Sequence, residues 1–100
     1  MTCLAKPLSK DQETRALIVG ALVLHPAVSI NTVAKTVEAC GIGHLRFHRT
    51  LASLRAEGLC DLVGHDILRL DGVDDLPQHT RIHASLIYLG ARKSMVPALA

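Results

Sequence analysis

The sequence predicts one mainly helical domain, and three observations support this prediction. Hydrophobic residues make up 49% of the 100-residue chain, whereas aromatic residues make up only 2%. The core must therefore consist mostly of leucine, valine, isoleucine and alanine, a composition that favours helices packed on helices. Apolar residues recur at helical spacing in four segments, and a chain of this length accommodates one domain rather than two.

The first helix is predicted over Lys10–Leu24. Ser9, followed three residues later by Gln12, fits a capping box, in which the two residues satisfy each other's backbone N–H groups. The last two turns are apolar almost all round, so we expect this helix to lie at the centre of the core. Pro26 is expected to end it, and residues 1–8 are expected to form a loose arm.

A second helix is predicted to begin near Ser29 or Asn31, because serine and asparagine are both favourable N-caps. Its apolar stripe consists of Ile30, Val33, Ala34 and Val37. Gly41 is expected to end this helix, since glycine readily adopts the left-handed backbone conformation that often follows a helix.

A third helix is predicted from Gly43 to Gly58. By helical spacing, the residues that face inward are Phe47, Leu51 and Leu54. The residues on the opposite face are Arg46, Arg49 and Ser53. No acidic residue occurs between Gly41 and Glu57, so we expect this helix to present a positively charged surface.

The segment after the third helix is predicted to form a β-hairpin. Two short apolar runs, Leu59–Val63 and Ile67–Leu70, flank the sequence Gly64-His65-Asp66, which is typical of a turn. Because the turn between the two strands is so short, the strands are expected to pair antiparallel.

A linker over residues 73–78 is predicted to lead into a fourth helix. The apolar stripe of this helix consists of Ile82, Leu86 and Leu89. Gly90 is expected to end the helix, and we expect residues 91–100 to be frayed.

The order helix, helix, glycine turn, helix, hairpin resembles the winged helix-turn-helix family of DNA-binding domains, in which the hairpin is the wing. The resemblance covers Gln12 to Leu70 and is most specific in the run Phe47–Leu59, where paired leucines precede Gly58-Leu59. It implies a mainly α fold with a three-helix core, a short wing and an additional C-terminal helix. The implied organisation is an arm over 1–8, the winged domain over 9–72, and a linker and helix over 73–100 that serves dimerisation.

The resemblance also implies which residues contact double-stranded DNA. In the family, side chains from the first two turns of the third helix enter the major groove. The corresponding residues here are His44, Arg46, His48 and Arg49, with Ser53 further along. Phosphate contacts are expected from Ser29, Asn31, Thr32 and Lys35, at and after the start of the second helix. The wing offers His65 and Arg69.

Two functions are compatible with this pattern. The first is a sequence-specific transcriptional regulator that binds DNA as a homodimer through Ile82, Leu86 and Leu89. The second is a protein-binding winged-helix module, such as a phage-encoded inhibitor of a nucleic-acid-handling complex of the CRISPR type. The modest net charge of +2 and the acidic Asp66 at the wing tip favour this alternative.

Other functional classes are not expected. No phosphate-binding glycine loop, nucleophile elbow or scaffolded carboxylate pair is present, so we expect neither an enzyme nor a cofactor. Cys40, His44 and His48 recur every four residues, but Gly41 and Gly43 interrupt the helix, so no metal site is predicted. The longest apolar run, Ala16–Leu24, is too short to cross a membrane. The odd number of cysteines indicates a reducing compartment, and we expect a cytoplasmic protein.

Overall fold

Four helices and three strands follow one another in the part of the chain described by a computed structural model, residues 9–25, 27–64, 67–70, 72 and 75–95. The elements are α1 (Lys10–Leu24), β1 (Ala27–Ser29), α2 (Ile30–Ala39), α3 (His44–Ala56), β2 (Cys60–Val63), β3 (Ile67–Leu70) and α4 (Gln78–Met95). The protein is therefore mainly helical, as predicted. None of the helices described is long and apolar enough to span a bilayer.

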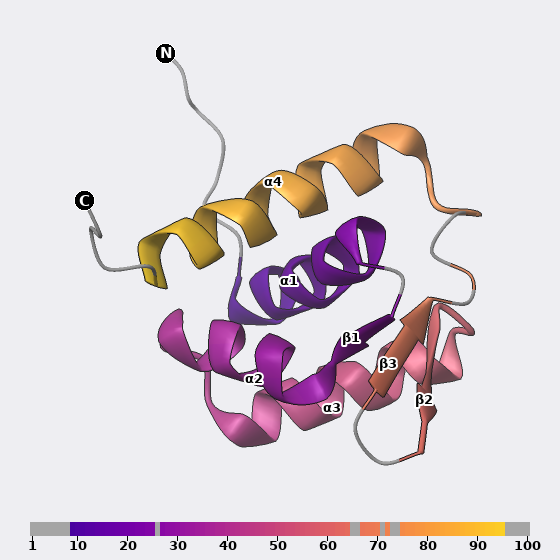
Figure 1. The fold of residues 1–100 in the computed structure, drawn as a ribbon, viewed down its shortest axis with the longest axis horizontal. Coiled ribbons are helices and arrows are strands. Elements are labelled where there is room, and N and C mark those ends of the chain that lie inside the picture. The colour runs from indigo at the N-terminus through magenta and orange to yellow at the C-terminus, as the bar shows by residue number, and fades with distance from the viewer. Residues whose placement is uncertain (1–8, 26, 65–66, 71, 73–74, 96–100) are drawn as a thin grey trace.

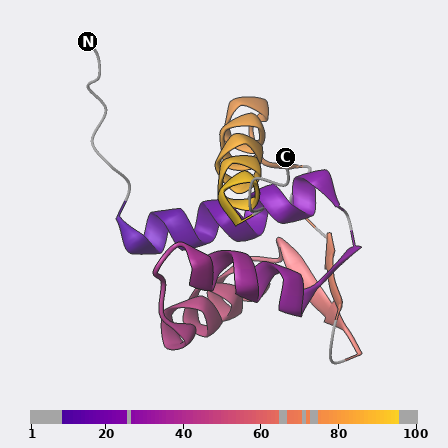
Figure 2. The ribbon, with the colours of Figure 1, turned by 60° about the vertical axis from the view of Figure 1, so that its left-hand side comes forward.

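α1 is the central helix, with α4 on one side and α2 and α3 on the other (Figures 1 and 2). Its residues Leu17, Ile18 and Ala21 are fully buried, which explains why the last turns are apolar on almost every side. The predicted capping box is present. The Ser9 hydroxyl accepts a hydrogen bond from the Gln12 backbone N–H at 3.1 Å, and the Gln12 side chain accepts one from the Ser9 N–H at 3.0 Å.

α4 crosses α1 at a point of very close approach between the two backbones. An added Cβ atom on Gly20 would lie 2.2 Å from the carbonyl oxygen of Ala84 and 2.8 Å from the Cβ of Tyr88. Ala84 and Tyr88 are buried against α1. Gly20 therefore lets the helices approach more closely than any residue with a side chain would allow.

The turn between α2 and α3 is closed by glycine, as predicted. Gly41 has a φ of 78°, and the N–H groups of Gly41 and Ile42 donate to the carbonyls of Glu38 and Val37 at 2.9 and 3.3 Å. This pattern is a Schellman motif. Ile42 is buried just after it, so the turn is anchored in the core and fixes where α3 begins.

α3 ends with the same motif. Gly58 has a φ of 79°, and the N–H of Leu59 donates to the carbonyl of Leu54 at 3.0 Å. Leu59 and Cys60 are buried where β2 starts. The predicted reversal from helix to strand at Gly58 is therefore confirmed.

The hairpin belongs to a three-stranded antiparallel sheet, because β1 pairs with β3 on the side away from β2. The register places Val28 opposite Leu68, and Leu62 opposite Leu68 from the other side. β1 was not predicted. Its three residues are too few to show the alternation that identifies a strand, and it forms only because β3 offers a free edge.

α4 extends beyond its predicted end. We expected Gly90 to terminate the helix and residues 91–100 to be frayed, but the helix continues to Met95. Glycine within a helix costs only about 1 kcal/mol relative to alanine, and later residues offset this cost. Ala91 packs against the core, and Arg92 donates to the Thr36 hydroxyl on α2 at 3.2 Å. The predicted arm, turn tip and linker residues 1–8, 65–66 and 73–74 lie outside the described residues.

Substitution of Gly20 by alanine should destabilise the protein. The new methyl group would meet the Ala84 carbonyl, so α1 and α4 would have to separate. Overpacking of this kind typically costs about 1–3 kcal/mol, which exceeds the roughly 1 kcal/mol gained in helix propensity. Urea unfolding followed by circular dichroism measures the change.

Gly90→Ala is the matched control, because it makes the same change in a helix where no atom lies within 4 Å of the added Cβ. This variant should be stabilised by up to about 1 kcal/mol. Equal stabilisation of both variants would contradict the close approach at Gly20.

Candidate nucleic-acid interface

α3 presents one buried and one exposed face. Phe47, Leu51 and Leu54 are nearly fully buried against the other helices, as the spacing predicted. The exposed residues on the other side are His44, Leu45, Arg46, His48, Arg49 and Ser53. The packing of the first face holds the second rigidly toward solvent.

Two shallow depressions border this exposed face. One lies between α2 and α3 and brings Asn31 and Lys35 together with His44. The other lies between α1 and α3 and is lined by Arg15, Arg49 and Ser53, among others. The structure therefore gathers most of the residues proposed for contact around α3, although they come from separate segments.

α2 begins where the sequence predicted, but two of the four residues expected to contact phosphate there are only partly exposed to solvent. Ser29 is the N-cap of α2 and is only half exposed, and its side chain makes no capping hydrogen bond. Thr32 is also half-buried, and its carbonyl accepts the Thr36 hydroxyl at 2.8 Å. Asn31 and Lys35 are exposed.

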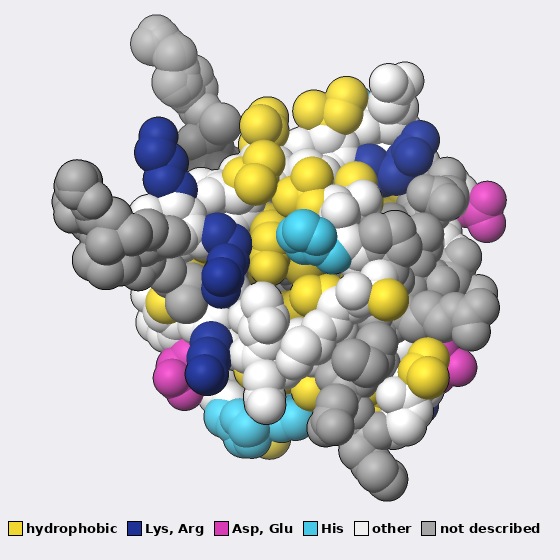
Figure 3. Space-filling model, in the orientation of Figure 1, with side chains coloured by type: hydrophobic (Ala, Val, Ile, Leu, Met, Phe, Trp, Pro, Cys, Tyr) yellow, Lys and Arg dark blue, Asp and Glu magenta, His cyan; other side chains and the backbone are white. Residues whose placement is uncertain are grey.

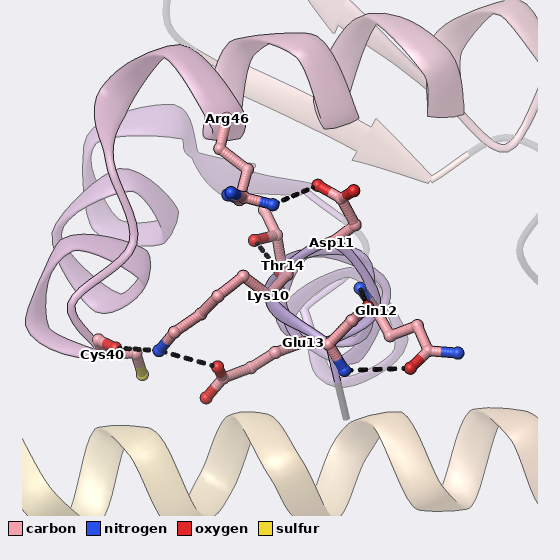
Figure 4. A network of polar contacts seen from close by, with 8 residues as sticks. Lys10, Asp11, Gln12, Glu13, Thr14, Cys40 and Arg46 are labelled. Carbon is pink, nitrogen blue, oxygen red and sulfur yellow. Dashed lines mark hydrogen bonds and ion pairs between the residues drawn. The ribbon is translucent and has the colours of Figure 1, made fainter. Parts of the chain in front are cut away.

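Acidic residues neutralise part of the surface that was predicted to be positive. Arg46 donates to the carboxylate of Asp11 on α1 at 2.7 Å, as Figure 4 shows. Arg55 lies 3.5 Å from Asp61 on β2. Arg46, expected on the exposed positive face, is therefore paired within the molecule, and the neutralising acid comes from α1 and not from α3 itself. Among the described residues, no ion pair is found for Arg49.

A second ion pair connects α1 to the end of α3. Arg15 donates to both carboxylate oxygens of Glu57 at 2.7 Å, the bidentate geometry that suits a guanidinium. These hydrogen bonds hold the pKa of Glu57 below its ordinary value of 4.5, and they raise the pKa of Arg15. The pair fixes α3 on α1 next to Arg49.

Two histidines on the first turns of α3 are in direct contact. The Nε2 atoms of His44 and His48 lie 2.9 Å apart, and their rings meet edge to face. The ring of His48 also contacts the edge of Phe47, with ring centres 5.3 Å apart. Because Phe47 is buried, it supports the orientation of His48.

The remaining predicted residues lie away from α3 or outside the described part. His65 is not among the described residues, and for Arg69 only the backbone in β3 is described. Ile82, Leu86 and Leu89 on α4 are 49–62% exposed. Figure 3 shows hydrophobic side chains gathered over α4.

Sequence reasoning missed the contribution of α1 to this surface. Asp11 and Arg15 lie one turn apart on the polar side of α1, and each pairs with a residue of the α3 segment. Their four-residue spacing signals a shared helix face, but nothing in the sequence shows which helix they meet.

No set of three or more histidine, cysteine or acidic side chains is arranged to hold a metal within the described residues. Comparison of the chain with protein-family models, with curated proteins and with solved structures found no match. A functional proposal therefore depends on the geometry of this chain alone.

Replacement of Glu57 by glutamine should reduce the pH dependence of stability. A carboxylate whose pKa is lowered by folding stabilises the protein above its unfolded pKa, and the stabilisation is lost as the pH falls through the folded value. The pair is well exposed, with side chains 40% and 44% accessible, so its contribution is at most about 1 kcal/mol. The difference between wild type and variant should thus be largest at neutral pH and vanish in acid. Urea unfolding at a series of pH values from about 3 to about 7, which spans the titration of a glutamate, measures it.

Glu38→Gln is the control, since it removes a carboxylate on α2 for which no ion pair is found within the described residues. A constant difference between Glu57→Gln and wild type across the titration would contradict the role assigned to the Arg15–Glu57 pair.

Proposed function

We propose that this protein is a winged helix-turn-helix regulator that binds double-stranded DNA in a sequence-specific manner, with α3 in the major groove. The observation that carries the proposal is the two-sided character of α3. Its apolar side is locked into the core while His48, Arg49 and Ser53 are exposed on the other side. A rigid helix that projects polar side chains in this way matches the dimensions and the hydrogen-bonding groups of the major groove.

Arg49 is the side chain best suited to read a base. An arginine can donate two parallel hydrogen bonds to guanine, and no ion pair of Arg49 is found within the described residues, although Asp11 lines the same depression. Arg46 would first have to leave Asp11. Asn31 and Lys35, across the depression between α2 and α3, would contact the phosphates that flank the groove.

A second copy of the chain would complete the binding unit. One small winged domain covers little DNA, and two copies would read two half-sites about one helical turn apart. The exposed stripe of Ile82, Leu86 and Leu89 on α4 offers an apolar surface on the opposite side of α1 from α3. We therefore propose α4 as the dimer contact.

A protein partner is the second candidate function, and the ion pairs around α3 favour it. Arg46 and Arg55 are both opposed by carboxylates, so the surface is a pattern of alternating charge, which suits specific protein contacts better than a uniform polyphosphate. Affinity purification followed by sequencing of bound DNA and mass spectrometry of bound protein separates the two. A stoichiometric protein with no enriched DNA would favour this candidate.

Arg49→Ala should weaken DNA binding by roughly 1–3 kcal/mol, or about 5- to 150-fold, because a base contact is lost. The binding sequence is first selected from a random duplex library, and affinity is then measured by fluorescence anisotropy. Arg46→Ala should have a smaller effect, since this side chain is already paired with Asp11.

Lys93→Ala is the charge-matched control, because it also removes one positive charge but from the exposed end of α4. This variant should bind almost as wild type does. If no duplex binds at low salt, or if Lys93→Ala and Arg49→Ala weaken binding equally, α3 does not act as the reading helix.

Asp11→Asn should strengthen DNA binding. The substitution removes a negative charge beside the proposed interface and releases Arg46 from its 2.7 Å ion pair, so one more cation becomes available to the DNA. We expect affinity to increase several-fold. The slope of the logarithm of the binding constant against the logarithm of salt concentration should increase in magnitude by about one, because about one more counterion is released. Asp75→Asn makes the same change in charge before α4 and should leave the salt dependence almost unaltered. A decrease in affinity for Asp11→Asn would indicate that Asp11 positions Arg46 for DNA.

A further inference from the structure

The two contacting histidines on α3 bring two potential metal-binding atoms close together. The Nε2 atoms of His44 and His48 are 2.9 Å apart, and both side chains are exposed. In Figure 3 histidine side chains gather over the start of α3. We propose that His44 and His48 bind a divalent transition-metal ion through their Nε2 atoms, with water in the remaining positions.

The separation of the two nitrogens indicates the kind of ion. Imidazole nitrogen lies about 2.1 Å from such ions. Two donors 2.9 Å apart at that distance subtend an angle of about 90° at the metal, whereas a tetrahedral site needs a separation of about 3.4 Å. An angle near 90° suits adjacent positions of an octahedral or square-planar ion, so Ni²⁺ and Cu²⁺ fit better than Zn²⁺.

The protein pre-arranges this pair. The ring of His48 lies between the ring of His44, with centres 4.2 Å apart, and the buried ring of Phe47. Without metal, one Nε2–H donates to the other Nε2. When the ion binds, that proton moves to Nδ1 of the same ring, and both Nε2 lone pairs are then available to the metal. The ring contacts hold the two nitrogens close before the ion binds, which lowers the entropy cost of binding.

The surroundings are compatible with a cation at this point. Of the two arginines that flank His48 on α3, Arg46 is paired with Asp11, and Arg49 follows His48 directly in the sequence. Across the depression that His44 shares with α2, Glu38 and Lys35 carry opposite charges. Cys40 is not needed as a ligand: it is the C-cap of α2, separated from α3 by the glycine turn.

Titration of the full chain, without an affinity tag, by Ni²⁺ in a calorimeter tests the proposal. Wild type should bind one equivalent, and His44→Ala and His48→Ala should each weaken binding by at least about tenfold, because a two-point attachment becomes a single one. Both residues are exposed, so the variants should keep the fold, which circular dichroism verifies.

The chain provides its own control in His79 and His83, which have the same four-residue spacing on α4 and are exposed. No ring contact or hydrogen bond between these two is found in the described structure. The His79→Ala/His83→Ala variant should retain wild-type Ni²⁺ binding. Retention of binding by His44→Ala, or its loss in the α4 variant, would overturn the proposal. The measurement contains no DNA, so its outcome is independent of the function proposed above.

Discussion

The contact between α1 and α4 at Gly20 is the constraint on which the arrangement of the other elements depends. The two backbones lie so close there that even a methyl group would overlap the Ala84 carbonyl. This approach places α4 on one side of α1 and leaves the other side to α2 and α3 (Figure 2). A central helix that is covered from both sides buries apolar residues on most sides of its last turns, and it can do so with aliphatic side chains alone.

The features that the sequence predicted well are those set by neighbouring residues. The start of α1 depends on Ser9 and Gln12, three positions apart, and its observed bounds agree with those predicted. The ends of α2 and α3 depend on the left-handed conformations of Gly41 and Gly58. β1 and the C-terminal turns of α4 were not predicted, because both depend on distant partners. β1 needs the edge of β3, and the end of α4 needs Thr36 on α2.

The same distinction applies to the candidate site. The exposed face of α3 followed from the spacing of Phe47, Leu51 and Leu54 within one helix. Its charge did not, because Asp11 lies 35 positions from Arg46 and Glu57 lies 42 positions from Arg15. The contact between His44 and His48 lies between these cases. Their spacing placed them on one side of the helix, but the 2.9 Å separation of their nitrogens and the contact of His48 with Phe47 are set by side-chain conformation.

The pairing of α1 with α4 also has a consequence for how the chain folds while it is being synthesised. α1 leaves the ribosome first, but residues 25–77 must follow before α4 can cover it. At the usual rate of translation this takes about 3–10 s. During that interval the apolar surface of α1 around Gly20, which later packs against Ala84 of α4, is not yet covered by α4. The helix at the centre of the core is thus the one whose partner α4 is made much later in the chain.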